Sequence, residues 1–124
     1  MTIQESAEMY LETILRLSEK RSIVRSIDIA HDMGFSKPSV SRAIKNLKEN
    51  GYISMETDTG AITLLPPGEE IARTIYERHK ALSSYLIRLG VDPKTAEEDA
   101  CRIEHVISDE SFRAIQRHAE EMKA

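Results

Sequence analysis

The sequence of 124 residues contains one cysteine and no long hydrophobic run. A single cysteine, Cys101, excludes an intramolecular disulfide framework. No segment approaches the roughly 20 consecutive apolar residues of a transmembrane helix, and the N-terminus lacks the apolar core of a signal peptide. Internal repeats and low-complexity tracts are also missing. We therefore expect a cytoplasmic protein without membrane partners, built as one domain or two small ones.

The net charge of −4 is unevenly distributed along the sequence. A constitutive nucleic-acid binder tends to be basic, and this sequence as a whole is not. From Lys37 to Lys48, however, four side chains are cationic and none is acidic. Residues 97–99 form an acidic cluster just before Cys101. The first segment suits an anionic partner, and the second either binds a cation or is a solvated helix face.

The N-terminal half has the pattern of a winged helix-turn-helix domain. Helices are predicted over residues 3–20, from a cap at Ser26 to Met33, and from a cap at Ser36 to Asn50-Gly51. Gly34 suits the left-handed conformation that ends a helix, and Pro38 suits a first helical turn. Two β-prone segments, 52–56 and 61–65, flank a turn and predict a hairpin.

The C-terminal half is predicted to be entirely helical. Pro66-Pro67-Gly68 is interpreted as the boundary, and helices are expected over residues 69–89, 92–105 and 108–122. The fold is therefore mainly α with a small β-hairpin wing: a DNA-binding domain over residues 1–65 and a second helical domain over 66–124. Three helices bury little core alone, so several apolar residues are expected to pack across a subunit interface, with packing inside one chain as the alternative. They include Tyr85, Leu86, Leu89, Val106, Ile107 and Phe112.

The helix that begins at Ser36 is suited to a DNA groove. Its hydroxyl groups, on Ser36, Ser39 and Ser41, are good phosphate donors near a helix N-terminus. Lys37, Lys45 and Lys48 add a salt-sensitive electrostatic attraction to phosphates. Arg42 has the planar guanidinium that can contact a guanine in the major groove. An exposed cationic helix face with no DNA role is the alternative interpretation.

Cys101, Glu104 and His105 form the strongest candidate for a metal site. At about 100° per residue, positions i, i+3 and i+4 of a helix share a sector of roughly 100°. A thiol, a carboxylate and an imidazole on one face suit a divalent transition metal. A lone cysteine on an apolar helix is more often an inert core residue, but its two neighbours favour a ligand.

Four segments together resemble the diphtheria-toxin-repressor family of iron- and manganese-dependent bacterial repressors. They are E-M-Y-L-E-T-I-L at 8–15, S-K-P-S-V-S at 36–41, Arg78-His79, and D-A-C-R-I-E-H-V-I-S-D-E at 99–110. The resemblance covers essentially the whole chain. It implies a winged-helix domain, a helical dimerisation and metal-binding domain, and a homodimer that binds a pseudo-palindromic double-stranded DNA operator when it holds metal. The expected form is a short one, without the SH3-like third domain of longer iron repressors.

The resemblance also assigns metal ligands residue by residue. The primary site of the family falls on Met9, Cys101, Glu104 and His105, which are the residue types of the iron-responsive branch. Glu12 matches a ligand of the manganese branch. A second, ancillary site is implied at His79, Glu97 and Glu104, with Ser83 where the iron branch has a glutamate and Glu97 where it has a histidine. We expect that second site to be weakened or rearranged.

At the DNA surface the resemblance places Ser36, Pro38, Ser39 and Ser41, with Arg42 where the iron branch carries glutamine. Sulfur ligands favour Fe(II), Co(II), Ni(II) or Zn(II) over Mn(II), and availability in a cell makes Fe(II) the expected activator of the repressor. Manganese-responsive repression is the alternative within the family. A metal-independent regulator that senses redox state through Cys101 is a further alternative.

An enzyme is not expected. Cys101 and His105 could serve as nucleophile and base, but no oxyanion donors, glycine-rich loop or third orienting group accompany them, and no small-molecule substrate is implied.

Overall fold

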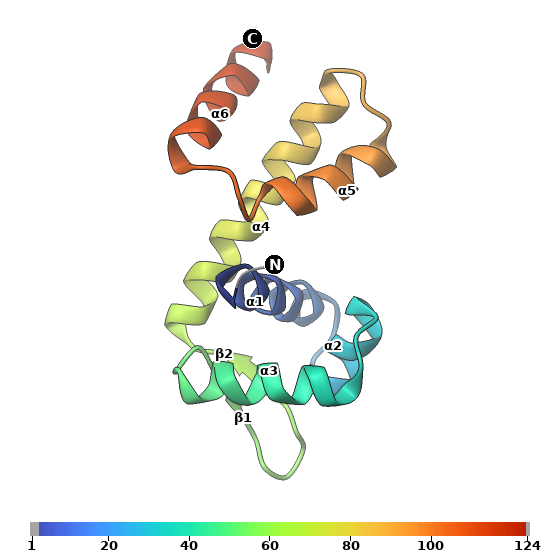
Figure 1. The fold of residues 1–124 in the computed structure, drawn as a ribbon, viewed down its shortest axis with the longest axis vertical. Coiled ribbons are helices and arrows are strands. Elements are labelled where there is room, and N and C mark those ends of the chain that lie inside the picture. Colours follow the sequence, from blue (N-terminus) through green and yellow to red (C-terminus); the bar gives the residue numbers. More distant parts are fainter. Residues whose placement is uncertain (1–2, 124) are drawn as a thin grey trace. The chain divides into compact units, whose positions relative to one another are not determined.

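A computed structural model describes residues 3–123 of the chain (Figure 1). It contains six helices and a two-stranded antiparallel hairpin within these residues. The chain divides into two compact units, Met1–Arg73 and Thr74–Ala124, and each is described by itself. The fold is the one expected, a winged helix-turn-helix unit with a mainly helical unit after it.

The first unit contains helices α1 (Ile3–Lys20), α2 (Ser26–Met33) and α3 (Lys37–Glu49), strands β1 (Ile53–Met55) and β2 (Ile62–Leu64), and the start of α4 (Pro66–Arg88). The strands pair with Ser54 opposite Thr63. Helix α1 contacts α2, α3 and β2, so its apolar stripe supplies the centre of this unit. Leu11 and Ile14 of α1 are almost completely buried, as are Val40 and Ile44 of α3. The burial of these apolar side chains is the main favourable contribution to the free energy that packs the helix-turn-helix against the hairpin.

Local capping interactions determine where α2 and α3 begin and end. The Oγ of Ser36 accepts a hydrogen bond from the backbone N–H of Ser39 at 3.3 Å, which satisfies one of the unpaired donors at the start of α3. Gly34 has φ 68° and ψ 28°, the left-handed conformation predicted for the end of α2. The prediction for Ser26 was wrong in detail. Ser26 is the first residue of α2, and Arg25 precedes it as the cap, with its backbone N–H donating to Oδ2 of Asp28 at 2.9 Å.

The second unit holds the remainder of α4, together with α5 (Pro93–Ile103) and α6 (Asp109–Lys123). Its core is small: Leu82, Ala100 and Phe112 are buried together. Phe112 was expected at a subunit interface, and this prediction was wrong, because the ring is only 8% exposed within its own chain. Ile107 packs against the same cluster. Leu89 and Val106, in contrast, are 55% and 68% exposed and remain free to meet a partner.

Two predicted helix ends differ from the structure. Pro66-Pro67-Gly68 was interpreted as a break, but these residues form the first turn of α4, where missing N–H groups cost little. Helix α5 was expected to reach His105 and ends at Ile103 instead, so that Glu104 and His105 follow it in a turn.

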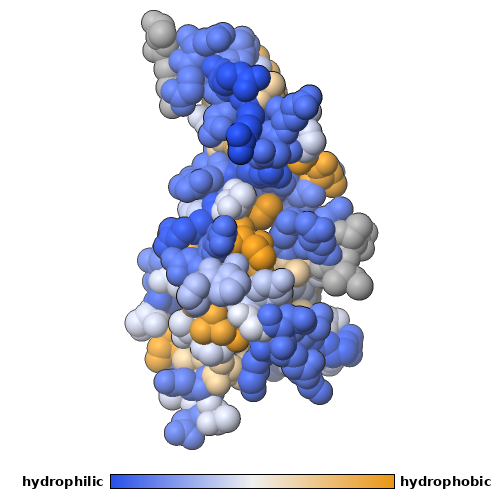
Figure 2. Space-filling model, turned by 90° about the vertical axis from the view of Figure 1, so that its left-hand side faces the viewer, coloured by the Kyte–Doolittle hydropathy of each residue, from blue (hydrophilic) through white to orange (hydrophobic). Residues whose placement is uncertain are grey.

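None of the helices over residues 3–123 is both long and apolar enough to cross a membrane. On the face drawn in Figure 2, hydrophilic side chains predominate and hydrophobic ones occur in small separate groups. The large apolar side chains that remain exposed are Ile23, Ile27, Phe35, Ile87, Leu89, Val106 and Met122.

Candidate metal centre and nucleic-acid interface

The outer face of α3 is polar and accessible. Lys37, Pro38, Ser41, Arg42 and Lys45 are exposed, and Ser39 is half-buried. The remaining predicted DNA contact, the cap residue Ser36, is also exposed. The structure thus places the predicted DNA-binding residues together along one helix and leaves them open to a ligand.

Hydroxyl groups form a short network at the start of this face. Oγ of Ser36 lies 2.9 Å from Oγ of Ser39, and Nη2 of Arg42 donates to the same Ser39 oxygen at 3.4 Å. A guanidinium group and two hydroxyls therefore meet within the first two turns of α3. These groups can donate to phosphate or base oxygens, and the exposed lysines add positive charge around them.

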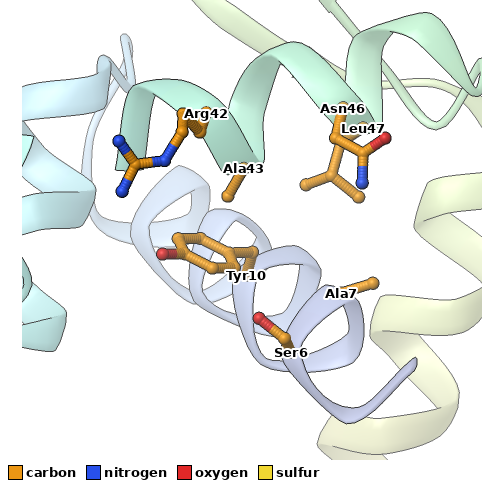
Figure 3. Close-up of a pocket in the computed structure, with 7 residues that line it drawn as sticks. All are labelled: Ser6, Ala7, Tyr10, Arg42, Ala43, Asn46 and Leu47. Carbon is orange, nitrogen blue, oxygen red and sulfur yellow. The ribbon is translucent and has the colours of Figure 1, made fainter. Parts of the chain in front are cut away.

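Arg42 also borders a pocket between α1 and α3. The pocket has a volume of about 260 Å³ and is lined by Ser6, Ala7, Tyr10, Arg42, Ala43, Asn46 and Leu47 (Figure 3). Tyr10 is only 4% exposed. Burial raises the pKa of its phenol, and the positive charge of Arg42 opposes this rise. Tyr10 and Arg42 therefore line one pocket from two helices, a relationship that nothing in the sequence indicates.

The wing is tied to the helix-turn-helix through Arg25. Nε of Arg25 donates to the backbone carbonyl of Thr59, in the hairpin turn, at 2.7 Å. Arg25 and Thr59 are 34 residues apart, so the bond holds the tip of the wing against the start of α2. Residue spacing alone could not have identified this contact, because it depends on how the hairpin folds back.

Four of the predicted metal ligands come together in the second unit. His79 of α4 lies between two carboxylates: its Nδ1 is 2.8 Å from Oε2 of Glu104, and its Nε2 is 2.9 Å from Oε2 of Glu97. Nε2 of His105 is 3.3 Å from the other oxygen of Glu104. Two imidazoles and two carboxylates therefore form a continuous chain in the order Glu97, His79, Glu104 and His105.

Glu104 is the most unusual member of this group because its side chain is fully buried. Its Oε1 makes no hydrogen bond to any described residue, although His105 is nearby. Burying a carboxylate is costly unless a cation or several donors compensate it. Nitrogen and oxygen donors around a buried anionic oxygen suit a divalent metal ion. The residues present therefore fit a metal chemically.

The remaining predicted ligands lie on α5 and α1. Cys101 is exposed on α5, whereas Glu104 and His105 are buried. The early end of α5 accounts for part of this difference, since the three residues do not belong to one continuous helix. Met9 is half-buried and Glu12 is buried, and both lie on α1 in the first unit. Ser83 is buried, and its Oγ donates to the backbone carbonyl of His79 one turn earlier, so its hydrogen-bonding group is satisfied within α4.

Arg78, the neighbour of His79 on α4, contacts the segment that follows α5 and the start of α6. Nη1 of Arg78 donates to the carbonyl of Ile107 at 3.3 Å, and its guanidinium lies 5.3 Å from the centre of the Phe112 ring. Arg78 thereby fixes α4 against the segment that follows Glu104 and His105. We assign it a structural role beside the candidate metal centre.

A winged helix-turn-helix with an exposed basic helix, joined to a unit that groups imidazoles and carboxylates, defines a DNA-binding protein with a metal-responsive part. Comparison with known proteins gives the family. Residues 2–61 match the N-terminal DNA-binding domain of iron-dependent repressors, and residues 66–124 match their metal-binding and dimerisation domain. The chain belongs to this family, and it is a metal-dependent transcriptional repressor.

Two relatives show how far the similarity extends. An uncharacterized HTH-type transcriptional regulator of Methanocaldococcus jannaschii is 34% identical over 123 residues, which cover 98% of each chain. Transcriptional regulator MntR of Salmonella typhimurium is 35% identical over 90% of this chain and 71% of its own.

A solved structure of a manganese-dependent transcriptional repressor in complex with manganese is also similar. It matches with a TM-score of 0.81 and 29% identity over 90% of this chain. The match covers 51% of that protein, so the present chain spans about half its length.

Proposed function

We propose that the chain is a homodimeric repressor that binds an operator in double-stranded DNA when it holds Fe(II), and so controls genes of metal homeostasis. The observation that carries metal-dependent DNA binding is the grouping of His79, Glu97 and His105 around the buried carboxylate of Glu104, in a chain whose first unit is a winged helix-turn-helix. The place of action would be the cytoplasm, with the operator DNA. No enzymatic role is proposed.

The proposed ligands come from both units. Met9 and Glu12 of α1, together with Cys101, Glu104 and His105, would form the primary site. His79 and Glu97, with Glu104, would form the second. When bound, the metal supplies positive charge and fixed coordination directions that the protein alone lacks. Ligands contributed by both units would restrict the motion of the two DNA-binding units of the homodimer. This restriction lowers the entropic cost of binding two operator half-sites.

The proposed DNA contacts are Ser36, Lys37, Pro38, Ser39, Ser41, Arg42 and Lys45. Their exposure along α3 supports this assignment. Dimerisation is proposed through the second unit, where Ile87, Leu89, Val106 and Met122 leave apolar surface uncovered in the single chain.

Manganese-responsive repression is the competing proposal, and one observation favours it. The donors grouped in the second unit are nitrogen and oxygen atoms, whereas the only thiol, Cys101, is exposed. Oxygen and nitrogen ligands suit Mn(II) better than sulfur does. Two compared proteins, the manganese-dependent repressor and MntR, carry names consistent with this alternative.

The test is operator binding as a function of metal. A preferred sequence is first selected from random duplex DNA by the metal-loaded protein, and its dissociation constant is then measured by fluorescence anisotropy without metal and with Fe(II), Mn(II), Co(II), Ni(II) or Zn(II), under anaerobic conditions for Fe(II). We expect tighter binding with metal by about tenfold or more. Equal affinity with and without every ion would refute metal regulation, and strongest activation by Mn(II) would replace the iron assignment.

A further inference from the structure

Arg16 of α1 lies between two carboxylates of the first unit. Its Nε is 3.6 Å from Oε1 of Glu12, one turn earlier on α1, and its Nη2 donates to Oδ2 of Asp32 on α2 at 3.1 Å. Asp32 belongs to the last turn of α2, just before the Gly34 turn that leads toward α3. One guanidinium group therefore joins a proposed metal ligand to the helix-turn-helix.

Several contacts hold this guanidinium group in place. Nη2 of Arg16 also donates to Oγ1 of Thr13 at 3.5 Å, and that hydroxyl donates to the backbone carbonyl of Met9 at 2.8 Å. The Arg16 side chain is 33% exposed, and that of Glu12 is 8% exposed. Salt screens partly buried charges less than charges on the open surface, so a change of charge at Glu12 acts on Arg16.

The two ion pairs of Arg16 depend on each other because one cation faces two anions. Its single positive charge compensates Glu12 and Asp32 only in part. A divalent ion held by Glu12 would compensate that carboxylate and repel the guanidinium group. The charge of Arg16 would then be left to Asp32, and this would strengthen the ion pair between α1 and α2.

We propose that Arg16 is a positioning residue that couples the metal to the helix-turn-helix: it competes with the metal for Glu12, and metal binding strengthens its pair with Asp32, which fixes α2 against α1. This inference rests on the proposed function, since it requires that Glu12 be a metal ligand. It goes further by naming the residue through which the occupied site acts on the DNA-binding unit. Coupling between two sites is reciprocal, so the same ion pair also sets metal affinity.

The Co(II) affinity of the DNA-free protein tests the competition. It is measured by competition with a chromophoric chelator for wild type, E12Q, R16Q, R16K, D32N and the double variant R16Q/D32N. The affinity that is lost in E12Q is the one that belongs to Glu12. The melting temperature of each metal-free variant is measured beside it, and D32N decides the outcome if R16Q does not fold.

The matched controls are R21Q and D58N. Both residues are exposed in the first unit, and the two substitutions change the net charge as R16Q and D32N do. Arg21 also pairs with a carboxylate of α2, since its Nη1 lies 3.1 Å from Oδ1 of Asp28. R21Q and D58N should both bind Co(II) with the wild-type affinity.

The two ends of the pair should shift metal affinity in opposite directions. R16Q should bind Co(II) about fivefold more tightly than wild type, because the competing cation is gone. D32N should bind it about twofold more weakly, because Arg16 is then left to Glu12 alone. The double variant should match R16Q, and R16K, which keeps the charge, should stay near wild type. A purely structural role of the Arg16–Asp32 pair would not produce shifts of opposite sign.

Operator affinity tests whether the effect reaches the DNA-binding unit. The ratio of the dissociation constants without and with the most strongly activating ion should fall by about threefold in R16Q and in D32N, since neither variant can form the Arg16–Asp32 ion pair. R21Q and D58N should keep the wild-type ratio.

Three results would overturn the inference alone: unchanged or like-signed shifts of Co(II) affinity in R16Q and D32N, equal shifts in the controls, or a wild-type ratio of operator affinities in both variants. If E12Q binds Co(II) as wild type does, Glu12 is not a ligand, and the proposed ligand set fails together with the inference. If wild type binds the operator equally with and without metal, the proposed function itself fails.

Discussion

Nδ1 of His79, in α4, lies 2.8 Å from Oε2 of Glu104, the residue that follows the end of α5. The Glu104 side chain is fully buried and that of His79 is 14% exposed. This contact joins two proposed metal ligands from different segments of one unit. Preorganised ligands of this kind need little rearrangement to bind an ion.

Replacing Glu104 by glutamine should therefore weaken metal binding strongly without unfolding the metal-free protein. The amide oxygen of the substituted side chain can still accept a hydrogen bond from His79, but it supplies no negative charge. We expect metal affinity to fall by about 100-fold. Because a ligand that binds only the folded state stabilises it, metal should raise the melting temperature of wild type and not of E104Q.

Glu121→Gln is the matched control for this prediction. Glu121 is exposed on α6, and the substitution makes the same chemical change away from the candidate centre. E121Q should show the wild-type rise in melting temperature. An equal rise in E104Q and E121Q would mean that Glu104 is not a ligand.

The role of Cys101 can be decided by thiol labelling. The side chain is the only thiol and is exposed, so metal-free protein should react quickly with a disulfide reagent such as 5,5′-dithiobis(2-nitrobenzoate). If the thiolate is a metal ligand, as we propose, saturating Fe(II) or Co(II) should slow the reaction by about tenfold or more. Equal rates with and without metal would remove Cys101 from the ligand set. Release of DNA by an oxidant and not by a chelator would favour the redox-sensing alternative.

The salt dependence of DNA affinity should distinguish the lysines of α3 from lysines elsewhere in the chain. Lys37 and Lys45 are exposed on the proposed DNA face, and each phosphate contact releases about one counterion. Replacing either by alanine should reduce the slope of log affinity against log salt by about 1, with little change in base preference. Lys94→Ala, at an exposed position of the second unit, should leave the slope unchanged. A wild-type slope in both K37A and K45A would argue against this face of α3.

Gly68 should tolerate no side chain. A Cβ at this position would lie 2.2 Å from the backbone carbonyl oxygen of Tyr52, so α4 or the segment that leads into β1 would have to move. We expect Gly68→Ala to lower the free energy of unfolding by about 3 kcal/mol or more, measured by denaturant titration. Gly51→Ala meets open space but has φ of 79°, and should cost about 1–2 kcal/mol. Comparable losses in the two variants would mean that the close approach at Gly68 is relieved at little cost.

The fold of the first unit, the winged helix-turn-helix, was largely predictable because its determinants are local. Apolar spacing gave α1, and the predicted cap at Ser36, the left-handed Gly34 and the hairpin all occur in the structure. Each of these signals acts within a few residues, where sequence distance and spatial distance agree. Gly68 shows the limit of such reasoning, since what it must avoid is a carbonyl sixteen residues earlier, and only the packed structure reveals it.

Four of the predicted metal ligands lie together in the second unit, but their arrangement was not predictable, and the ligand roles of Met9, Glu12 and Cys101 stay predictions. Residue types and resemblance gave His79, Glu97, Glu104 and His105, whereas periodicity put Cys101, Glu104 and His105 on one continuous helix. The helix ends at Ile103, and the side chain of His79 comes in from α4 to meet Glu104. Where a helix ends depends on packing and on the partners of its last carbonyls, which the local sequence only partly encodes.

The pKa of Tyr10 gives an independent test of its burial and of its proximity to Arg42. Burial raises this pKa above the ordinary value near 10, so the folded protein holds the phenol proton more strongly than the unfolded chain. The stabilisation is therefore fully present below about pH 10 and is lost as the pH rises through the folded pKa. In metal-free protein, the difference in tyrosinate absorbance between wild type and Y10F should show a transition above pH 10, and the stability of wild type relative to Y10F should decline over the same range. Because the charge of Arg42 lowers the pKa of Tyr10, Arg42→Ala should move the transition to still higher pH. A transition at or below pH 10, or one that Arg42→Ala leaves in place, would show that the phenol is not buried beside this guanidinium.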